Sequence, residues 1–185
     1  MEGDTISSQG KVLVMKLEGQ GTLRITLRPD WSPESVDFIE QIISTGCKRC
    51  KFYRAEKPGI FQGIMKAKTD IPLPALGPCP ADFADVVNKC FSHDPNCACH
   101  GPLMSRGMVG WAGGGAGPDF FIDHYEKTAK HWGTTHTAWG ELEDEASHNL
   151  VKRIWGLPAT KKGGMTFLDE EIRFTMSVES SSGVA

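Results

Sequence analysis

One arginine and one glutamine lie eight residues apart in the stretch "KFYRAEKPGIFQGIM", Lys51 to Met65. The guanidinium of Arg54 stays charged and presents a rigid fork of N–H donors, while the amide of Gln62 can both donate and accept hydrogen bonds. If the two residues lie on adjacent antiparallel strands, both side chains can face one groove. A fixed donor in such a groove can stabilise charge or a lone pair that develops during a reaction. Without further context, an arginine beside a glutamine is more often a surface pair.

The elements that must position this pair are strands with two helices among them. "KVLVMKLEG" and "GTLRITLRP" alternate as two strands joined by a turn at residues 19–21. A helix is predicted over "WSPESVDFIEQIISTG", with Ser32 as N-cap and Gly46 as its stop. A second helix is predicted from about Ser147 to Trp155, and "MTFLDEEIRFTMSVE" reads as a final strand. This order predicts a closed or nearly closed antiparallel barrel that helices cap.

Composition limits the classes of function. The 185 residues fit one domain, and 39% hydrophobic with 23% charged residues is ordinary for a globular protein. A formal net charge of −3 favours neither nucleic acid nor an anionic membrane as partner. No run is long and apolar enough for a membrane span, and "MEGDTISSQG" lacks the apolar segment of a signal peptide. Export is therefore not encoded in the chain as given.

Three blocks resemble, in sequence order, those of the cyclophilins, the peptidyl-prolyl cis-trans isomerases. They are "CKRCKFYRAEKPGIFQG", "RGMVGWAGGGAGPDFFI" and "HTAWGELED". The resemblance covers residues 11–178 and implies a mainly β fold, a closed eight-stranded antiparallel β-barrel capped by two α-helices. Residues 65–106 would be a divergent, cysteine-containing insertion, and residues 1–10 and 179–185 flexible termini. The implied activity is isomerisation of Xaa-Pro bonds in protein folding, which needs neither a metal nor a cofactor.

The resemblance also implies roles for single residues. Arg54 stands at the position of the catalytic arginine, and Gln62 at that of the glutamine that orients it. Phe121 would form the floor of the proline pocket, Ala112 would pair its backbone with the peptide, and His136 would line the wall. The full set expected to bind substrate is Ile60, Phe61, Ala112, Phe121, His131, Trp132 and His136.

Several positions depart from the family pattern. Ungapped alignment places residues 59–60 where large pocket residues are usual, and a one-residue shift places residues 60–61 there. His131 holds the position of the tryptophan associated with tight cyclosporin binding, and Trp132 follows it. We therefore expect weak cyclosporin binding, unless Trp132 turns into the pocket. Asp119 stands where a glutamine is common, which predicts a remodelled neighbouring groove.

The six cysteines allow two main interpretations. Disulfides are favoured, because an even count in a loop-rich insertion is typical of them, although six cysteines permit 15 pairings. The alternative is a zinc site built from Cys47, Cys50, Cys97 and Cys99 with His93 or His100. A redox-active C-x-x-C is a third option, disfavoured because no thioredoxin-like βαβ pattern surrounds it. Disulfides favour a secretory lumen or a tethered ectodomain over the cytoplasm. The disulfide candidates are Cys47, Cys50, Cys79, Cys90, Cys97 and Cys99.

Three functions remain open at this point. The chain can be an active prolyl isomerase, a catalytically weak proline-peptide binding module, or a structural subunit whose insertion docks a partner. Retention of Arg54, Gln62, Phe121 and His136 favours the first over the third. The expected ligands are proline-containing polypeptides, and the chain is expected to be a monomer or a subunit of a larger assembly.

Overall fold

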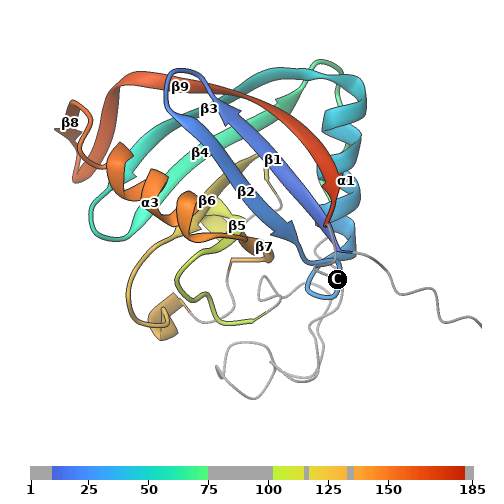
Figure 1. The fold of residues 1–185 in the computed structure, drawn as a ribbon, viewed down its shortest axis with the longest axis horizontal. Coiled ribbons are helices and arrows are strands. Elements are labelled where there is room, and N and C mark those ends of the chain that lie inside the picture. Colours follow the sequence, from blue (N-terminus) through green and yellow to red (C-terminus); the bar gives the residue numbers. More distant parts are fainter. Residues whose placement is uncertain (1–9, 75–101, 115–116, 133–135, 182–185) are drawn as a thin grey trace, which may run out of the picture.

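A computed structural model describes residues 10–74, 102–114, 117–132 and 136–181 of the chain. Its centre is an antiparallel sheet that closes on itself, because β1 pairs with both β2 and β9 (Figure 1). The order around the barrel is β1-β2-β7-β5-β6-β4-β3-β9, and β8 adds an outer edge to β9. The predicted eight-stranded barrel is thus confirmed. The strands are β1 (Lys11–Leu17), β2 (Gly21–Leu27), β3 (Cys47–Glu56), β4 (Ile60–Ala67), β5 (Met108–Trp111), β6 (Asp119–Asp123), β7 (Ala138–Leu142), β8 (Ala159–Lys162) and β9 (Met165–Ser180).

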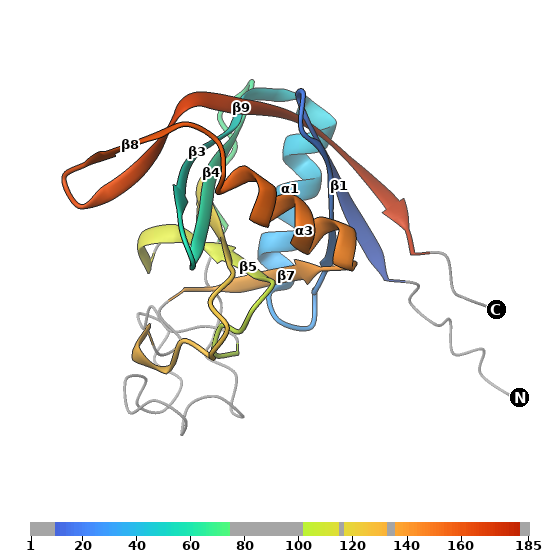
Figure 2. The same cartoon turned by 60° about the vertical axis from the view of Figure 1, so that its left-hand side comes forward.

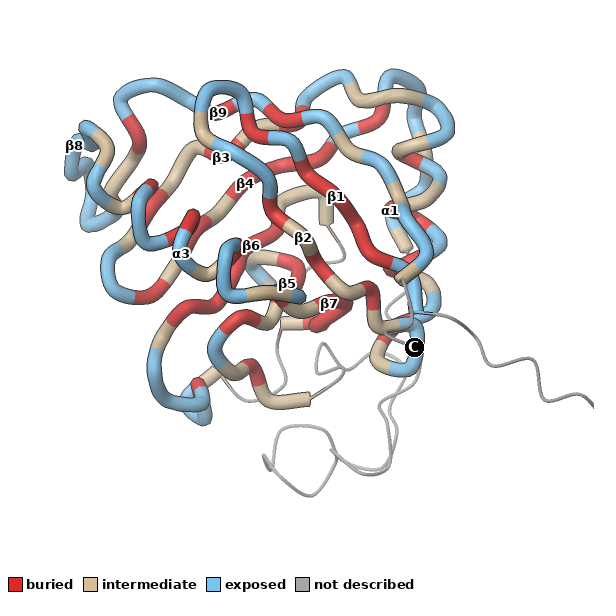
Figure 3. The backbone as a smooth tube through the Cα atoms, in the orientation of Figure 1, coloured by how far each residue is buried: buried red, intermediate tan, exposed pale blue. Residues whose placement is uncertain are grey.

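Alternation along the strands sorts side chains into the barrel or out of it. In the predicted β1–β2 hairpin, Leu23, Ile25 and Leu27 are at most 2% exposed, whereas Arg24 points outward and pairs with Glu143. Figure 3 shows the same alternation as short buried segments along most strands. The interior is filled by large aromatic side chains, namely Phe52, Phe61, Trp111, Phe120, Trp139 and Phe174. Such packing makes the barrel a solid core, with no room for a ligand inside it.

Helix α1 (Pro33–Thr45) forms as its caps predict. The Ser32 side chain accepts a hydrogen bond from the Ser35 backbone N–H, and the Gly46 N–H bonds to the Ile42 carbonyl. Its apolar stripe packs against β4, β7 and β9. In addition, the Trp111 indole N–H donates to the Ser35 hydroxyl over 2.9 Å. This bond fixes the start of the helix to the barrel core.

Helix α3 (Glu145–Ile154) starts two residues earlier than predicted. Asp144 is the N-cap, and its carboxylate accepts from the Ser147 backbone N–H. The sequence "EDEAS" contains several residues that can cap a helix, which is why its start was placed too late. Leu150, Val151 and Ile154 are buried where α3 covers β2 and β7. Figure 1 shows α1 and α3 covering different parts of the barrel.

The β8–β9 hairpin extends beyond the barrel wall (Figure 2). All four residues of β8 are exposed. Strand β9 runs to Ser180, so its last two residues belong to the sheet although the flexible terminus was expected to begin at 179. Most of the insertion expected at residues 65–106, namely residues 75–101, lies outside the described residues. No helix in the described segments is long and apolar enough to cross a membrane.

Candidate functional site

A β-bulge in β3 creates the polar side of the candidate site. Phe52 pairs with Gly63 and Arg54 pairs with Gln62, so Tyr53 is an extra residue without a partner position on β4. A residue added in this way shifts the phase of the strand, and two consecutive side chains then face the same side. Tyr53 and Arg54 both point out of the barrel, whereas Phe52 points into the core.

Four side chains form a directed chain of hydrogen bonds on this outer face. Arg54 Nη1 donates to Gln62 Oε1 over 2.9 Å, and Gln62 Nε2 donates to the Tyr53 hydroxyl over 2.8 Å. The Tyr53 hydroxyl then donates to Asp119 Oδ1 over 2.8 Å. Burial and, as the second largest cause, the hydrogen bond to Asp119 raise the pKa of Tyr53 well above its usual value. The hydroxyl therefore stays protonated. The chain fixes the orientation of the Gln62 amide.

Glu56 is a functional candidate that sequence reasoning missed. Its Oε1 accepts from Arg54 Nε at 3.2 Å and also from the Thr166 backbone N–H on β9. Burial acts to raise the pKa of Glu56, but the Thr166 and Arg54 hydrogen bonds outweigh it and keep the pKa below its usual value. Glu56 is therefore ionised at neutral pH and binds Nε of the guanidinium, while Gln62 binds Nη1. Its partner Thr166 lies 110 residues away, so no local signal indicates this contact.

An aromatic cluster forms the other side of the candidate site. The Phe121 ring meets His136 at 5.0 Å and Trp132 at 5.5 Å between ring centroids, both edge to face. Trp132 also contacts Tyr125 and His131. Cross-strand pairing joins this cluster to the polar chain, because Gln62 on β4 is paired with Arg54 on β3 and with Phe121 on β6. Arg54, Gln62 and Phe121 thus form one row across three strands.

His136 is held as a neutral ring. Its Nδ1 lies 3.1 Å from the Trp111 carbonyl oxygen, which can only accept, so Nδ1 carries the proton. Burial lowers the pKa of His136, and the bond to the carbonyl offsets this only in part. The Nε2 atom is then an acceptor. Ala112, the first residue of the short 3₁₀ turn Ala112–Gly114 (η1), directly follows Trp111 in the chain.

The remaining predicted residues do not all lie on the face of the barrel that carries the candidate site. Ile60 lies on the same outer face as Gln62, two residues away on β4, and is partly exposed. Phe61 points the opposite way, is fully buried and stacks on Phe52 with 3.8 Å between ring centroids. It does not lie with the other predicted residues, because side chains alternate along a strand. His131 is exposed on the 3₁₀ turn Lys130–Trp132 (η2).

Gly59 lies under an aromatic ring. A Cβ atom built on Gly59 would come within 2.4 Å of ring atoms of Tyr125. The ungapped alignment puts Gly59 where a large pocket residue is usual, and the Tyr125 ring takes up the space beside this glycine. The sequence offers no signal for this contact, since Gly59 lies in the turn between β3 and β4 and Tyr125 lies in the segment after β6.

Two of the six cysteines lie in the described residues. Cys47 and Cys50 form a disulfide at the start of β3, with 6.0 Å between their Cα atoms. A disulfide sulfur is not a zinc ligand, so the zinc alternative loses two of its members. Cys79, Cys90, Cys97 and Cys99, with His93 and His100, lie outside the described residues. Among the described residues, no group of three or more potential metal ligands comes together.

The barrel topology is that of a cyclophilin-type fold. One solved structure with this architecture is the cyclophilin type peptidyl-prolyl cis-trans isomerase of Cryptosporidium parvum, with 17% identity and a TM-score of 0.59. The match covers 94% of this chain and 99% of that chain. A second structure, of that isomerase in the presence of the dipeptide Ala-Pro, has 14% identity, a TM-score of 0.54, and coverage of 89% and 98%. No protein-family model and no curated protein matches the chain. The fold implied by the sequence blocks is confirmed.

Proposed function

We propose that the protein is a peptidyl-prolyl cis-trans isomerase that acts on Xaa-Pro bonds during protein folding. The observation that carries the proposal is the row of Arg54, Gln62 and Phe121 across β3, β4 and β6, with the 2.9 Å bond between the first two. The row places a fixed cation beside an aromatic surface. These are the two features that a twisted prolyl amide and its ring require.

The chemistry needs no covalent step. An Xaa-Pro bond isomerises slowly because the C–N bond is partly double, with a barrier of about 18–20 kcal/mol. As the amide twists, its nitrogen regains a lone pair that can accept a hydrogen bond. A donor aimed at this nitrogen stabilises the twisted state more than either planar state, which lowers the barrier.

Arg54 is suited to this role by the way it is held. Its Nε is held by Glu56 and its Nη1 by Gln62, while Nη2 makes no hydrogen bond to any described residue. Two anchors fix the plane of the guanidinium, so its remaining N–H groups keep a constant direction. Such preorganisation avoids reorganisation cost when the amide twists.

The proposed ligands are proline-containing polypeptides. The proline ring would lie against Phe121, and the neutral His136 would line the wall. One neighbouring solved structure was determined in the presence of Ala-Pro, which supports this class of ligand. The sequence predicts weak cyclosporin binding unless Trp132 turns into the pocket, and Trp132 does pack against Phe121, so a cyclosporin titration tests which side of this condition holds. An oxidising compartment is also proposed, because the Cys47–Cys50 disulfide would persist there.

Exchange NMR on a short Xaa-Pro peptide tests the proposal without a coupling protease. We expect the wild type to accelerate cis-trans exchange and Arg54→Ala to lose most of this effect. Arg49→Ala is the matched control, because it removes the same group from the same strand and Arg49 has no ion-pair or hydrogen-bond partner among the described residues. Equal rates in wild type and Arg54→Ala would overturn the role of the arginine.

A binding module with little turnover is the second candidate. Trp132 packs edge to face on Phe121, and Phe121 is only 4% exposed. Trp132 and His136 both cover the Phe121 ring, so a proline ring can stack on it only if part of this cover moves. The variant Trp132→Ala separates the two candidates. Acceleration in this variant but not in the wild type would indicate a site that Trp132 closes. Equal acceleration in the variant and the wild type would indicate an open isomerase.

A further inference from the structure

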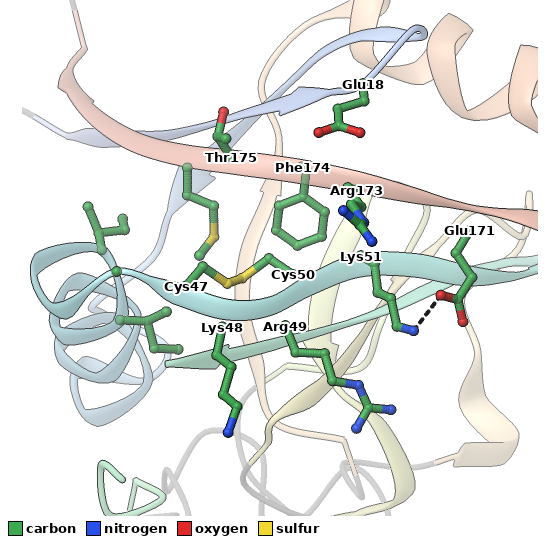
Figure 4. A pocket seen from close by; sticks show the side chains of 14 residues that line it. Glu18, Cys47, Lys48, Arg49, Cys50, Lys51, Glu171, Arg173, Phe174 and Thr175 are labelled. Atoms are coloured by element: carbon green, nitrogen blue, oxygen red, sulfur yellow. Dashed lines mark hydrogen bonds and ion pairs between the residues drawn. A yellow bond between two sulfur atoms is a disulfide. The ribbon is translucent and has the colours of Figure 1, made fainter. Parts of the chain in front are cut away.

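The Cys47–Cys50 disulfide lines the wall of a cavity that the proposed isomerase site does not use. The cavity measures about 540 Å³ and lies between the end of α1, the start of β3 and β9 (Figure 4). Its apolar wall includes Ile42, Phe174 and Met176. A disulfide within a cavity of this size can be reached by another side chain, which a disulfide packed in a core cannot.

The two cysteines differ in exposure. Cys47 is partly exposed, whereas Cys50 is 9% exposed and belongs to the hydrophobic core cluster. An incoming nucleophile therefore meets the sulfur of Cys47 first. The sulfur of Cys50 is then the leaving group, held inside the protein where it can re-form the bond.

The residues between the cysteines are both cations. Lys48 and Arg49 are exposed, and neither has an ion-pair partner among the described residues. Lys51, by contrast, is paired with Glu171. Figure 4 shows Lys48 and Arg49 leaving β3 on the same side, with their charged ends pointing away from the disulfide. Positive charge on this exposed face of the strand attracts an incoming thiolate.

We propose that Cys47–Cys50 is a thiol–disulfide exchange site for a polypeptide that carries two thiols. A thiolate of that polypeptide attacks Cys47 Sγ, the bond between Cys47 and Cys50 breaks, and Cys50 leaves as a thiolate that takes a proton from solvent. The second thiolate of the polypeptide then attacks the mixed disulfide at its own first sulfur. Cys47 leaves as a thiolate and is protonated in turn. Two electrons pass from the polypeptide to the cysteine pair, and the polypeptide keeps the new disulfide.

Trapping with oxidised glutathione tests which sulfur is the site of exchange. In Cys50→Ser, we expect the free Cys47 to form the mixed disulfide with glutathione, located by mass spectrometry on the peptide that contains residue 47. In Cys47→Ser, we expect Cys50 to react at least tenfold more slowly, because it is buried. Equal rates at the two positions would overturn the assignment. The full chain is used, and peptide mapping separates these products from reactions at the other cysteines.

A second measurement tests the role of the cations with the natural pair intact. A synthetic peptide with two reduced cysteines is mixed with the oxidised wild type, and reduction of the residue 47–50 pair is followed over time. We expect Lys48→Gln/Arg49→Gln to react several-fold more slowly. The matched control is Lys161→Gln/Lys162→Gln, which removes two adjacent exposed cations from β8. Equal slowing in both variants, or a wild-type pair that stays oxidised, would overturn the proposal, whatever the isomerase assay shows.

Discussion

The two ends of strand β3 differ in how their reactive side chains are held. At the end that leads to β4, Arg54 is fixed by two hydrogen-bonding partners from two different strands, β3 itself and β4. At the end that follows α1, Lys48 and Arg49 have no ion-pair partner among the described residues, and a disulfide spans them. The first arrangement suits an electrostatic catalyst whose groups must not move. The second suits a site where bonds between sulfur atoms are exchanged.

The strongest test of this contrast removes one arginine from each end. We expect Arg54→Ala to lower kcat/KM for prolyl isomerisation by about 100-fold or more, the range seen when one preorganised donor is removed. Arg49→Ala should leave isomerisation unchanged and slow thiol exchange at Cys47. Exchange NMR and thiol-exchange rates, measured on both variants, check this. If each variant changed both activities, the two ends of β3 would be one coupled site.

Removal of the disulfide should affect stability and leave isomerisation almost unchanged. Loop-closure entropy for a four-residue loop predicts a loss of about 2 kcal/mol in the double variant Cys47→Ser/Cys50→Ser. Isomerase activity should change less than twofold, because Arg54 keeps its partners. Urea unfolding and exchange NMR measure the two quantities. A large loss of activity in a fully folded variant would show that the disulfide also positions Arg54.

Glu56 should behave as a positioning residue for Arg54. In Glu56→Gln the charge is lost but the shape is kept, so we expect kcat to fall about tenfold with KM little changed, a cost of about 1.4 kcal/mol. Glu56→Asp should recover part of the loss if its carboxylate reaches Arg54. The two constants are obtained from exchange rates at several peptide concentrations. A rise in KM alone would instead mean that Glu56 contacts the substrate.

Two neighbouring residues at the end of β6, Asp123 and His124, should make the free energy of unfolding depend on pH. Burial raises the pKa of Asp123 to about 6, and burial with the charge of Arg106 lowers the pKa of His124 to about 4. Between pH 4 and 6 the folded state binds more protons than the unfolded state at Asp123, so this residue makes stability fall as pH rises. At His124 the unfolded state binds more protons up to about pH 6.5, so stability rises with pH. The two effects oppose each other in wild type.

Single substitutions at these neighbouring positions should therefore separate the two slopes. Relative to wild type, Asp123→Asn should make stability rise more steeply with pH, by about 1 kcal/mol per pH unit at most. His124→Gln should change the slope in the opposite direction. Urea unfolding at pH 4.5, 5.5 and 6.5 gives the slopes. If the free energy of unfolding changed with pH in both variants as it does in wild type, neither group would be the cause of the pH dependence.

Local signals predicted much of this molecule. Ser32 and Gly46 marked the ends of α1 correctly, and the Arg54–Gln62 contact followed from two strands joined by a short turn. These predictions depend on residues close together in the chain. The role of Glu56 could not be predicted, because its second partner is the backbone of Thr166 on β9. Pattern analysis could not settle whether Phe61 belongs to the pocket, since the answer depends on which face each residue of β4 occupies.

The bulge at Tyr53 shifts the alternation of inward and outward side chains within residues 50–56 of β3. Before it, inward side chains have even numbers, such as Cys50 and Phe52, and after it they have odd numbers, such as Ala55. The strand can thus satisfy two periodic patterns that a regular strand could not combine. Deletion of one residue here would remove the bulge. Either the side chains that fill the core or those that face the candidate site would then point to the wrong side of the strand. The number of residues in this part of β3 therefore matters as much as which residues they are.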